Sequence, residues 1–538
     1  MSFPEEVLKE VTAPLNNELT EFLFLLLTRE EQDGFRAILG NYTPKERVDV
    51  YAHSLNEFFK HLPKIYETGF KVQIDTLLKH YEPEFVQNSY STFWTDLKGF
   101  LVPIRFPHSL RKEHSYILGS SGSGKTQLIQ QLISQDLDTS SSIIVIDSQG
   151  DLIKNLKYSK LIDPERLVIV DPIDSVEHPL ALNMFDIGQS EMNLDPVSYE
   201  RHMNGVVETL NFVFSAVMDS PLTDKQGVVF GFCIRLMLLV PRATILSLVD
   251  VLENGVERYQ KYIRTMPDIS QSFFRSAFPE SARVKNEYRE TKTQIIRRLY
   301  SLLQNPTISR IFKSSKNRFN LSKEMDSGKV ILISTDISLL KKQGCAFFGR
   351  YFLSQISQAM LDRLNRPQIK RRKTYVYVDE CGDYLSSDDV NITDILEKGR
   401  KFNVGLTLAH QHTQQLPPNV FQSIRSNTSI KFVGSCSAGD ARIMKGDMRN
   451  DFLHNMPKLK FCAYTRGSST SLTVKVKPGI IEDSEQRTDE ELEAIMQVNR
   501  AKYCVDYEIP DYSPAIPVKD EINEEKPGIP EDPLAPYT

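Results

Sequence analysis

Residues 119–126 carry the pattern G-x-x-x-x-G-K-[ST] between two well-marked elements. Residues 116–118 are apolar and predict a short strand before the pattern, and residues 127–133 after it have the apolar spacing of a helix. A strand, a loop of small residues and a helix in this order are the context that a phosphate-binding loop requires. The eight residues of the loop are Gly119, Ser120, Ser121, Gly122, Ser123, Gly124, Lys125 and Thr126.

A loop of this kind holds the phosphates of a nucleotide. Its small residues let the backbone curl so that successive N–H groups point at the β- and γ-phosphates, and the next helix adds the partial positive charge of its N-terminus. Lys125 is predicted to place its ammonium against the β/γ oxygens, and the Thr126 hydroxyl to hold Mg²⁺. We therefore expect ATP and Mg²⁺ as cofactors; the alternative is a glycine-rich loop with a structural role.

The composition limits the class of protein. A length of 538 residues suggests two or three domains, and shares of 40% hydrophobic and 25% charged residues are ordinary for a globular protein. The net charge of −5 argues against a surface coated in positive charge, although it does not exclude a local basic channel.

The cysteines and the apolar runs indicate the compartment. Six scattered cysteines without a C-x-x-C pair predict free buried thiols in a reducing environment. The most apolar runs, residues 22–27 and 228–240, are shorter than the about 20 residues of a membrane helix. The N-terminus lacks the basic region of a signal peptide. We expect a cytoplasmic protein without a membrane span.

From about residue 112, short strands alternate with helices, which is the pattern of an α/β parallel sheet. Several of these strands are fully apolar, as strands covered on both faces should be. The expected core strands are residues 143–146, 167–170, 330–333, 375–378, 406–409, 430–433 and 461–464, and residues 471–476 are expected to form an edge strand or a hairpin. The predicted fold class is α/β, with a RecA-like P-loop NTPase core and a mostly parallel sheet.

Helical patterns precede and interrupt this core. Residues 1–105 are predicted to form a helical domain, with helices at 19–39, after the capping box that begins at Thr43, and at 66–81. This domain is either a bundle packed on the core or a partner-docking domain. Residues 191–324 are predicted to be a helical insertion that divides the core into residues 106–190 and 325–480. Residues 481–538, rich in Pro, Asp and Glu, are predicted to be a disordered acidic tail.

Residues 375–380 form an apolar strand that ends in two carboxylates, Asp379 and Glu380. In P-loop ATPases the first such carboxylate supports Mg²⁺. The second can polarise the attacking water, and a positioned general base contributes about 10²–10⁴-fold in rate. We assign Asp379 to the metal and Glu380 to catalysis; the alternative is a strand that ends in Asp-Glu by chance.

Residues 399–411, GRKFNVGLTLAHQ, supply two further candidates. The strand within them is predicted to place Gln411 at the carboxyl end of the sheet, where an amide can bind both the γ-phosphate and the attacking water. Arg400 precedes that strand and is expected on the surface. An exposed arginine is usually only solvated, but in a ring of ATPases it can reach a neighbour's γ-phosphate, where an arginine finger contributes about 10³–10⁵-fold.

The order of these motifs resembles a known superfamily. The phosphate loop is followed by a strand with D-x-x-G-D at residues 147–151, the segment LNMFD at 182–186, a helical insertion, the Asp-Glu strand and the GRK…AHQ segment. This order is similar to the FtsK/HerA superfamily of hexameric DNA translocases, and most similar to the type IV secretion coupling proteins (the TraD/TraG-like group). The resemblance covers about residues 112–470. It implies that Gln411 is a sensor and that Arg400 acts on a neighbouring subunit.

The chain also departs from these families. Coupling proteins begin with transmembrane helices and HerA-type proteins with a small β-barrel, whereas residues 1–105 are predicted to be helical. The sequence has no helix-turn-helix, zinc finger or aromatic stacking motif. A basic cluster at residues 370–373 is either a phosphate-contacting loop or a solvated loop. DNA contact is therefore expected through a few loops that touch the backbone without reading sequence.

The resemblance implies a ring-forming, hexameric ATPase that moves double-stranded DNA. One alternative is a secretion ATPase that acts on protein and ignores DNA. A second is a nucleotide-gated assembly ATPase that couples a partner nuclease or effector to ATP state, with residues 1–105 as the docking domain.

Overall fold

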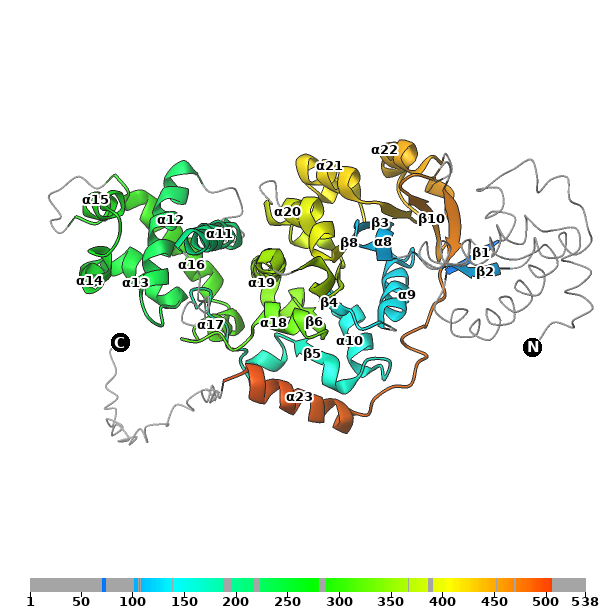
Figure 1. Ribbon diagram of the computed structural model, residues 1–538, viewed down its shortest axis with the longest axis horizontal. Coiled ribbons are helices and arrows are strands. Elements are labelled where there is room, and N and C mark those ends of the chain that lie inside the picture. The colour runs from blue at the N-terminus through cyan, green and yellow to red at the C-terminus, as the bar shows by residue number, and fades with distance from the viewer. Residues whose placement is uncertain are drawn as a thin grey trace, which may run out of the picture.

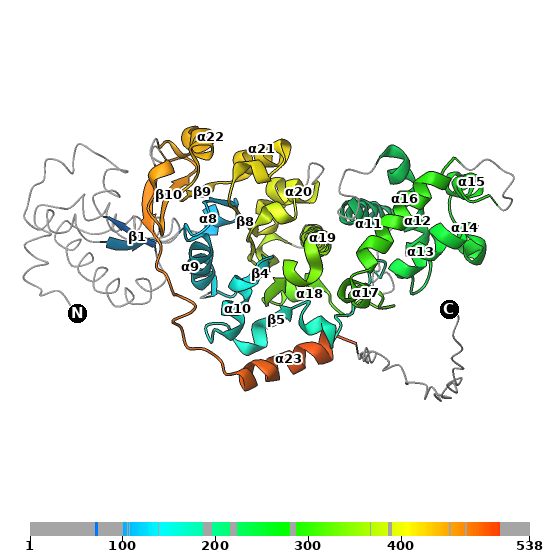
Figure 2. The ribbon, with the colours of Figure 1, turned by 180° about the vertical axis from the view of Figure 1, so that it is seen from behind.

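The computed structural model describes residues 70–73, 101–104, 106, 108–137, 139–186, 196–215, 223–279, 287–365, 367–385, 390–450, 453–468 and 471–505. The helices predicted at 19–39 and after Thr43 lie outside these residues. Figure 1 shows the helices α11–α16 on one side of the molecule and, on the opposite side, the strands β1 and β2, which form one end of the sheet. Figure 2 shows the same arrangement from behind.

The described strands form one sheet of eleven strands in the order β2-β1-β11-β10-β9-β3-β8-β7-β4-β6-β5. The run from β9 to β5 is parallel throughout, and the four strands from β10 to β2 pair antiparallel. This arrangement confirms the predicted fold class. The bounds are β1 Phe70–Gln73, β2 Leu101–Ile104, β3 Ser115–Leu118, β4 Ser142–Asp147, β5 Leu167–Val170, β6 Val330–Ser334, β7 Thr374–Val378, β8 Val404–His410, β9 Ile430–Val433, β10 Lys460–Thr465 and β11 Leu472–Lys475.

Alternate residues of the parallel strands face two separate apolar layers. Tyr116, Ile144 and Val376 pack into the layer that holds α19 and the helices between β5 and β6. Ile117 and Ile143, one residue away, pack into the opposite layer with α9, α10 and α23. Period-two burial on both faces explains why these strands are apolar throughout.

The described residues between β5 and β6 are mostly helical, and α11 contacts α19. The bounds of the helices are α8 His108–Arg111, α9 Lys125–Leu137, α10 Asp151–Tyr158, α11 Pro196–Ser215, α12 Asp224–Leu239, α13 Ile245–Asn254, α14 Gln260–Ile263, α15 Asp268–Ala277, α16 Arg289–Leu303, α17 Pro306–Phe312, α18 Leu321–Asp326, α19 Ile337–Leu361, α20 Val390–Lys398, α21 Pro418–Asn427, α22 Ala438–Met448 and α23 Asp489–Tyr503.

The helix predicted over residues 66–81 is wrong at its centre, because β1 lies there. Residues 70–73, Phe-Lys-Val-Gln, alternate apolar and polar, which is the period of a strand. β1 pairs antiparallel with β2 along all four residues and meets β11 at Lys71–Lys475. That pairing also corrects the edge-strand alternative for residues 471–476: β11 forms a hairpin with β10 and is covered by β1 on its other side.

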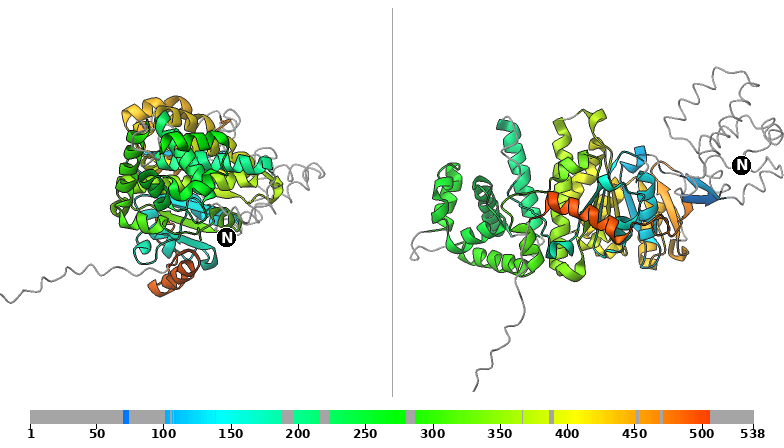
Figure 3. Two further views of the ribbon diagram at one scale, coloured as in Figure 1. Left: turned by 90° about the vertical axis from the view of Figure 1, so that its left-hand side faces the viewer. Right: turned by 90° about the horizontal axis from the view of Figure 1, so that it is seen from below.

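The disordered tail predicted from residue 481 is wrong for its first part, which contains α23. Thr488 and Glu491 form a capping box, in which the Thr488 hydroxyl accepts from Glu491 N (3.2 Å) and Thr488 N donates to Glu491 Oε2 (2.9 Å). Leu492 and Ile495 are buried in the apolar layer that holds α9 and α10, and Tyr503 is buried against Phe319. Figure 3 shows α23 lying across the β5 side of the sheet. Three of the acidic residues of this stretch, Asp489, Glu490 and Glu491, lie in the first turn of α23, where the helix dipole favours them.

Candidate functional site

The phosphate loop joins β3 to α9 at the carboxyl end of the parallel strands. Gly122 and Gly124 have φ of 75° and 104°, a region that glycine enters without a steric penalty. A Cβ atom at Gly119 would lie 2.6 Å from Ser123 Oγ, so the loop closes on itself there. The pattern therefore has glycine at the positions where this turn requires it.

Neighbouring strands hold the loop from outside. Gly119 N donates to His410 O (3.3 Å) and Ser120 N to Ser435 O (2.7 Å), at the ends of β8 and β9. Leu459 N donates to Ser123 O (2.9 Å), and a Cβ at Gly124 would meet Leu459 Cδ2 at 2.7 Å. Nothing in the local sequence pattern pointed to Leu459, because its contact with the loop comes from the fold.

Asp379 lies beside Thr126, as the metal assignment expects. Thr126 Oγ1 donates to Asp379 Oδ2 at 3.3 Å. Burial raises the pKa of Asp379 to about 7, and the charges of Asp147 and Glu380 add to the rise, whereas Lys125 opposes it. A buried carboxylate with this excess of negative charge, next to a hydroxyl, fits a divalent cation that brings its own charge and further oxygen ligands.

Glu380 joins two of the predicted site residues. Its Oε1 accepts a hydrogen bond from Gln411 Nε2 (2.9 Å) and lies 3.3 Å from Lys125 Nζ. Glu380 itself adopts φ of 49°, which is uncommon for a residue with a side chain. The structure therefore brings Lys125, Glu380 and Gln411 together directly beside the phosphate loop.

The segment after β8 links Gln411 to its surroundings. Gln415 Oε1 accepts from the backbone N–H groups of both Gln411 (2.9 Å) and His412 (3.0 Å). His410 is buried, its Nε2 lies 2.7 Å from Tyr116 Oη, and burial lowers its pKa to about 4. Because His410 is buried and neutral, we interpret it as a structural neighbour of the site.

Asp147, from the D-x-x-G-D segment, is a member of the site to which the sequence assigned no role. Its carboxylate is buried and accepts from Gln149 N (2.9 Å) and Leu152 N (3.1 Å) at the start of α10. Burial raises its pKa. The negative charge of Asp147 adds to the rise in the pKa of Asp379. The sequence signal that could have identified Asp147 was its position at the end of β4, the strand that pairs with β7.

Arg400 does not join the other site residues. It lies in the turn Gly399–Phe402, before the amino end of β8, whereas the phosphate loop lies at the carboxyl end. A strand of seven residues spans about 20 Å, so Arg400 cannot reach the loop of its own chain. Its side chain is 64% exposed, and Nη1 lies 2.9 Å from Glu113 Oε1.

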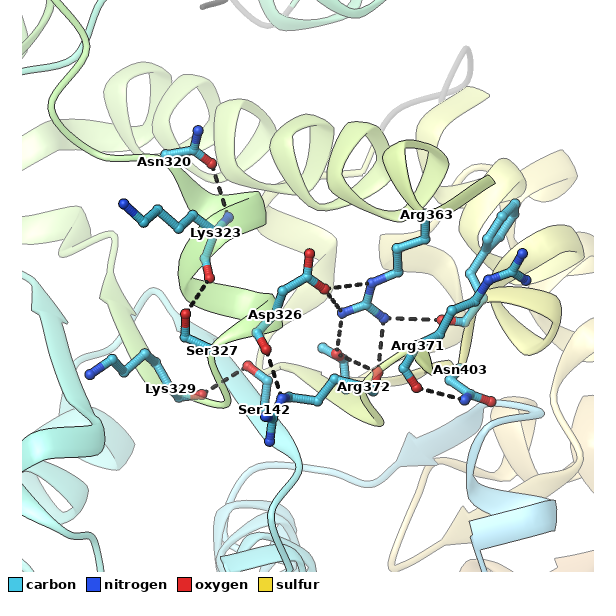
Figure 4. A network of polar contacts seen from close by, with 12 residues as sticks. Ser142, Asn320, Lys323, Asp326, Ser327, Lys329, Arg363, Arg371, Arg372 and Asn403 are labelled. Atoms are coloured by element: carbon cyan, nitrogen blue, oxygen red, sulfur yellow. Dashed lines mark hydrogen bonds and ion pairs between the residues drawn. The ribbon is translucent and has the colours of Figure 1, made fainter. Parts of the chain in front are cut away.

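The basic cluster at residues 370–373 contains two arginines that contact other parts of the chain and two exposed lysines. Arg371 Nη1 donates to Lys401 O (2.7 Å), and Arg372 Nε donates to Asp326 O (2.7 Å). Figure 4 shows both arginines inside a network of polar contacts. Lys370 and Lys373 are exposed. The interpretation as a wholly solvated loop is therefore wrong for the two arginines, which support the fold.

The fold and the site define a P-loop ATPase core. Residues 101–180 match the family model of the type IV secretion-system coupling protein DNA-binding domain. This match confirms the predicted resemblance to type IV secretion coupling proteins. No curated protein matches the chain at the level of sequence. Among the described residues, no helix has the length and apolar character needed to cross a membrane.

Several solved structures have a similar outline. The bacterial conjugative coupling protein TrwBdeltaN70 has 14% identity, with 72% of this chain and 88% of that chain covered and a TM-score of 0.49. The plasmid coupling protein TrwB in complex with ADP and Mg²⁺ has 14% identity, coverage of 70% and 87%, and a TM-score of 0.49. VirB4 of Thermoanaerobacter pseudethanolicus has 16% identity, coverage of 70% and 94%, and a TM-score of 0.47.

Proposed function

We propose that this protein assembles into a ring, binds ATP with Mg²⁺ between neighbouring subunits and uses hydrolysis to move double-stranded DNA. The observation that carries the proposal is the meeting of Lys125, Glu380 and Gln411 beside the phosphate loop, with Thr126 against Asp379. P-loop ATPases use groups of these types to bind phosphate, hold the metal and orient the attacking water.

Each residue has a separate task. Lys125 binds the β/γ oxygens, and Thr126 and Asp379 hold the metal, which when bound neutralises developing phosphate charge. Glu380 orients the water and accepts its proton at a carboxylate oxygen. Without nucleotide, Lys125 forms an ion pair with Glu380. When phosphate binds, Lys125 pairs with the phosphate instead, and the Glu380 carboxylate becomes available for the water.

Gln411 transmits the state of the site to the rest of the subunit. Its side chain contacts Glu380, and its backbone shares Gln415 Oε1 with His412. When Glu380 turns to the water, Gln411 loses its present acceptor and can bind the γ-phosphate. The loop after β8 is therefore the element that we expect to move with the nucleotide.

Arg400 completes the site of the next subunit. Its exposure, and its distance of about one strand length from the phosphate loop of its own chain, favour action in trans. A ring supplies one such arginine to every interface, and we propose a homo-hexamer. Arg400→Ala is expected to assemble but to hydrolyse ATP poorly.

DNA is the proposed substrate because the matching family model describes a DNA-binding domain. Contact is proposed to be independent of sequence, through basic loops that bind the phosphate backbone and weaken as salt rises. The exposed Lys370 and Lys373 are available for such contacts. Residues 1–105 remain a proposed docking region for a protein partner.

The deciding experiment is ATP hydrolysis by the purified full chain with and without long linear duplex DNA. Glu380→Gln is the inactive reference, and Glu397→Gln, an exposed change on α20, is the matched control. Stimulation by duplex DNA that disappears in Glu380→Gln supports the translocase. Turnover that ignores both duplex and single strands favours the protein-directed secretion ATPase. Slow turnover that rises only with a partner bound at residues 1–105 favours the gated assembly module.

A subunit-mixing experiment tests the ring separately. Lys125→Ala and Arg400→Ala are each expected to be nearly inactive alone. Co-expression of the two places some intact phosphate loops next to some intact arginines, so hydrolysis should return. If the mixture stays inactive although both variants assemble, Arg400 does not act in trans.

A further inference from the structure

We propose that Glu113 is a positioning residue that holds the Arg400 guanidinium in the orientation needed to reach a neighbouring subunit. This inference rests on the proposed role of Arg400 in trans. It starts from the ion pair between Arg400 Nη1 and Glu113 Oε1 at 2.9 Å. The Arg400 side chain is 64% exposed and that of Glu113 only 17%, so the carboxylate is the fixed member of the pair.

The Glu113 carboxylate is held by a second contact. Ser429 Oγ donates to Glu113 Oε2 at 2.7 Å, while Oε1 faces Arg400. The backbone of Ser429 also donates to Glu113 O at 2.9 Å, just before β9. A carboxylate with one oxygen held by a hydroxyl has little freedom to rotate, so it fixes the direction in which the guanidinium points.

The backbone around Glu113 is anchored on both sides. Arg111, two residues before, is buried and donates to Asp136 Oδ2 at 2.9 Å. His114, the next residue, is also buried, and its Nδ1 accepts from Leu406 N at 3.0 Å within β8. A Cβ atom at Gly399 would lie 2.8 Å from His114 Cε1, so the turn that carries Arg400 packs directly on this segment.

The turn Gly399–Phe402 is fixed from its other side by the network in Figure 4. Arg363, fully buried and paired with Asp326 at 2.9 Å, donates to Phe402 O at 3.0 Å. Arg371 donates to Lys401 O at 2.7 Å. The network thus sets the place of the turn, and Glu113 is the contact that acts on the Arg400 side chain itself.

The benefit is one of preorganisation. An arginine side chain loses rotamer entropy when it is ordered, and a partner that orders it beforehand removes part of that loss from the reaction. The side-chain contacts described for Glu113 are with Ser429 and Arg400, and neither residue belongs to the nucleotide site of its own subunit. Its loss should therefore lower kcat in the neighbouring site and leave the KM for ATP unchanged.

The test compares kcat and KM for Glu113→Ala, Glu113→Gln and Arg400→Ala in the full chain. We expect Glu113→Ala to lower kcat about threefold to tenfold. Glu113→Gln keeps an acceptor for Arg400 and should retain more activity. Asp394→Asn is the matched control, because it removes an ion pair with Lys398 on the preceding helix without touching Arg400.

Two further measurements separate positioning from a structural role. Adding Glu113→Ala to Arg400→Ala should cause no further fall in kcat, because Glu113 acts through Arg400. Glu113→Ala subunits co-expressed with Lys125→Ala subunits should have a higher turnover per intact phosphate loop than Glu113→Ala alone, since the Lys125→Ala neighbour supplies a well-placed Arg400. If Glu113→Ala lowers kcat equally with and without Arg400, or if mixed rings show no recovery of turnover, the role of Glu113 is overturned but that of Arg400 is not. Normal turnover of Arg400→Ala would overturn the finger role and this inference together.

Discussion

Asp379→Asn is expected to stabilise the protein without nucleotide at pH 8, although it removes a residue assigned to the metal. Asp379 is only 5% exposed, and burial together with Asp147 and Glu380 raises its pKa to about 7. The folded protein therefore opposes ionisation of this carboxylate. Replacing it with a neutral amide of the same shape removes that cost.

The magnitude follows from linkage. A carboxyl group with a folded-state pKa above its ordinary value of 3.8 keeps its proton longer in the folded state, so stability falls as pH rises from about 4 to about 7. About three pKa units correspond to about 4 kcal/mol as an upper bound. In the wild type, the Asp379 carboxylate accepts hydrogen bonds from Glu380 N (3.0 Å) and Thr126 Oγ1 (3.3 Å). The amide must replace both, and each hydrogen bond contributes about 1 kcal/mol. We expect a net gain of about 2 kcal/mol at pH 8.

Thermal melting at pH 6 and pH 8, with and without MgATP, measures this effect. The advantage of Asp379→Asn should be present at pH 8 and shrink at pH 6, where the wild-type carboxyl group is largely protonated. MgATP should raise the melting temperature of wild type more than that of the variant. Asp394→Asn, a partly exposed change, serves as the control. A variant that is less stable than wild type by the same margin at both pH values would refute the reasoning.

Two changes test the other structural claims. Gly124→Ala is expected to abolish nucleotide binding measured by calorimetry, because φ is 104° and the new Cβ would lie 2.7 Å from Leu459 Cδ2; Gly446→Ala, in open space on α22, should bind normally. Removal of residues 489–538 should lower the melting temperature clearly more than removal of residues 506–538, since only the longer deletion takes away the buried Leu492 and Tyr503 of α23.

The phosphate loop and the core strands could be predicted because their signals are local. Glycine spacing around Lys125 and fully apolar strands follow directly from what those elements bury and bind. The predicted strand ends lie within two residues of β4, β7 and β8. Strand order, in contrast, depends on contacts between residues far apart in the chain.

The wrong predictions, for β1 and α23, relied on composition or on a short local pattern and could not take contacts with distant residues into account. β1 has only four residues, and its identity as a strand depends on β2 and β11, which lie far away in sequence. α23 was hidden in an acidic stretch, although Leu492 and Ile495 already carried helical spacing beside a capping box at Thr488. Glu113 and Leu459 could not be found at all, because each acts on a loop more than 200 residues away.

The cost at Asp379 is itself an argument about function. The charges of Asp147 and Glu380 add to the rise in the pKa of Asp379 that burial causes, and the charge of Lys125 opposes it. A neutral residue directly after β7, whose five residues are all buried, would avoid this cost. Phosphates draw Lys125 away and add negative charge, so the site balances only when a divalent cation arrives with the nucleotide. We therefore propose that Asp379 is a metal ligand and that the cost of its ionisation is offset when MgATP binds.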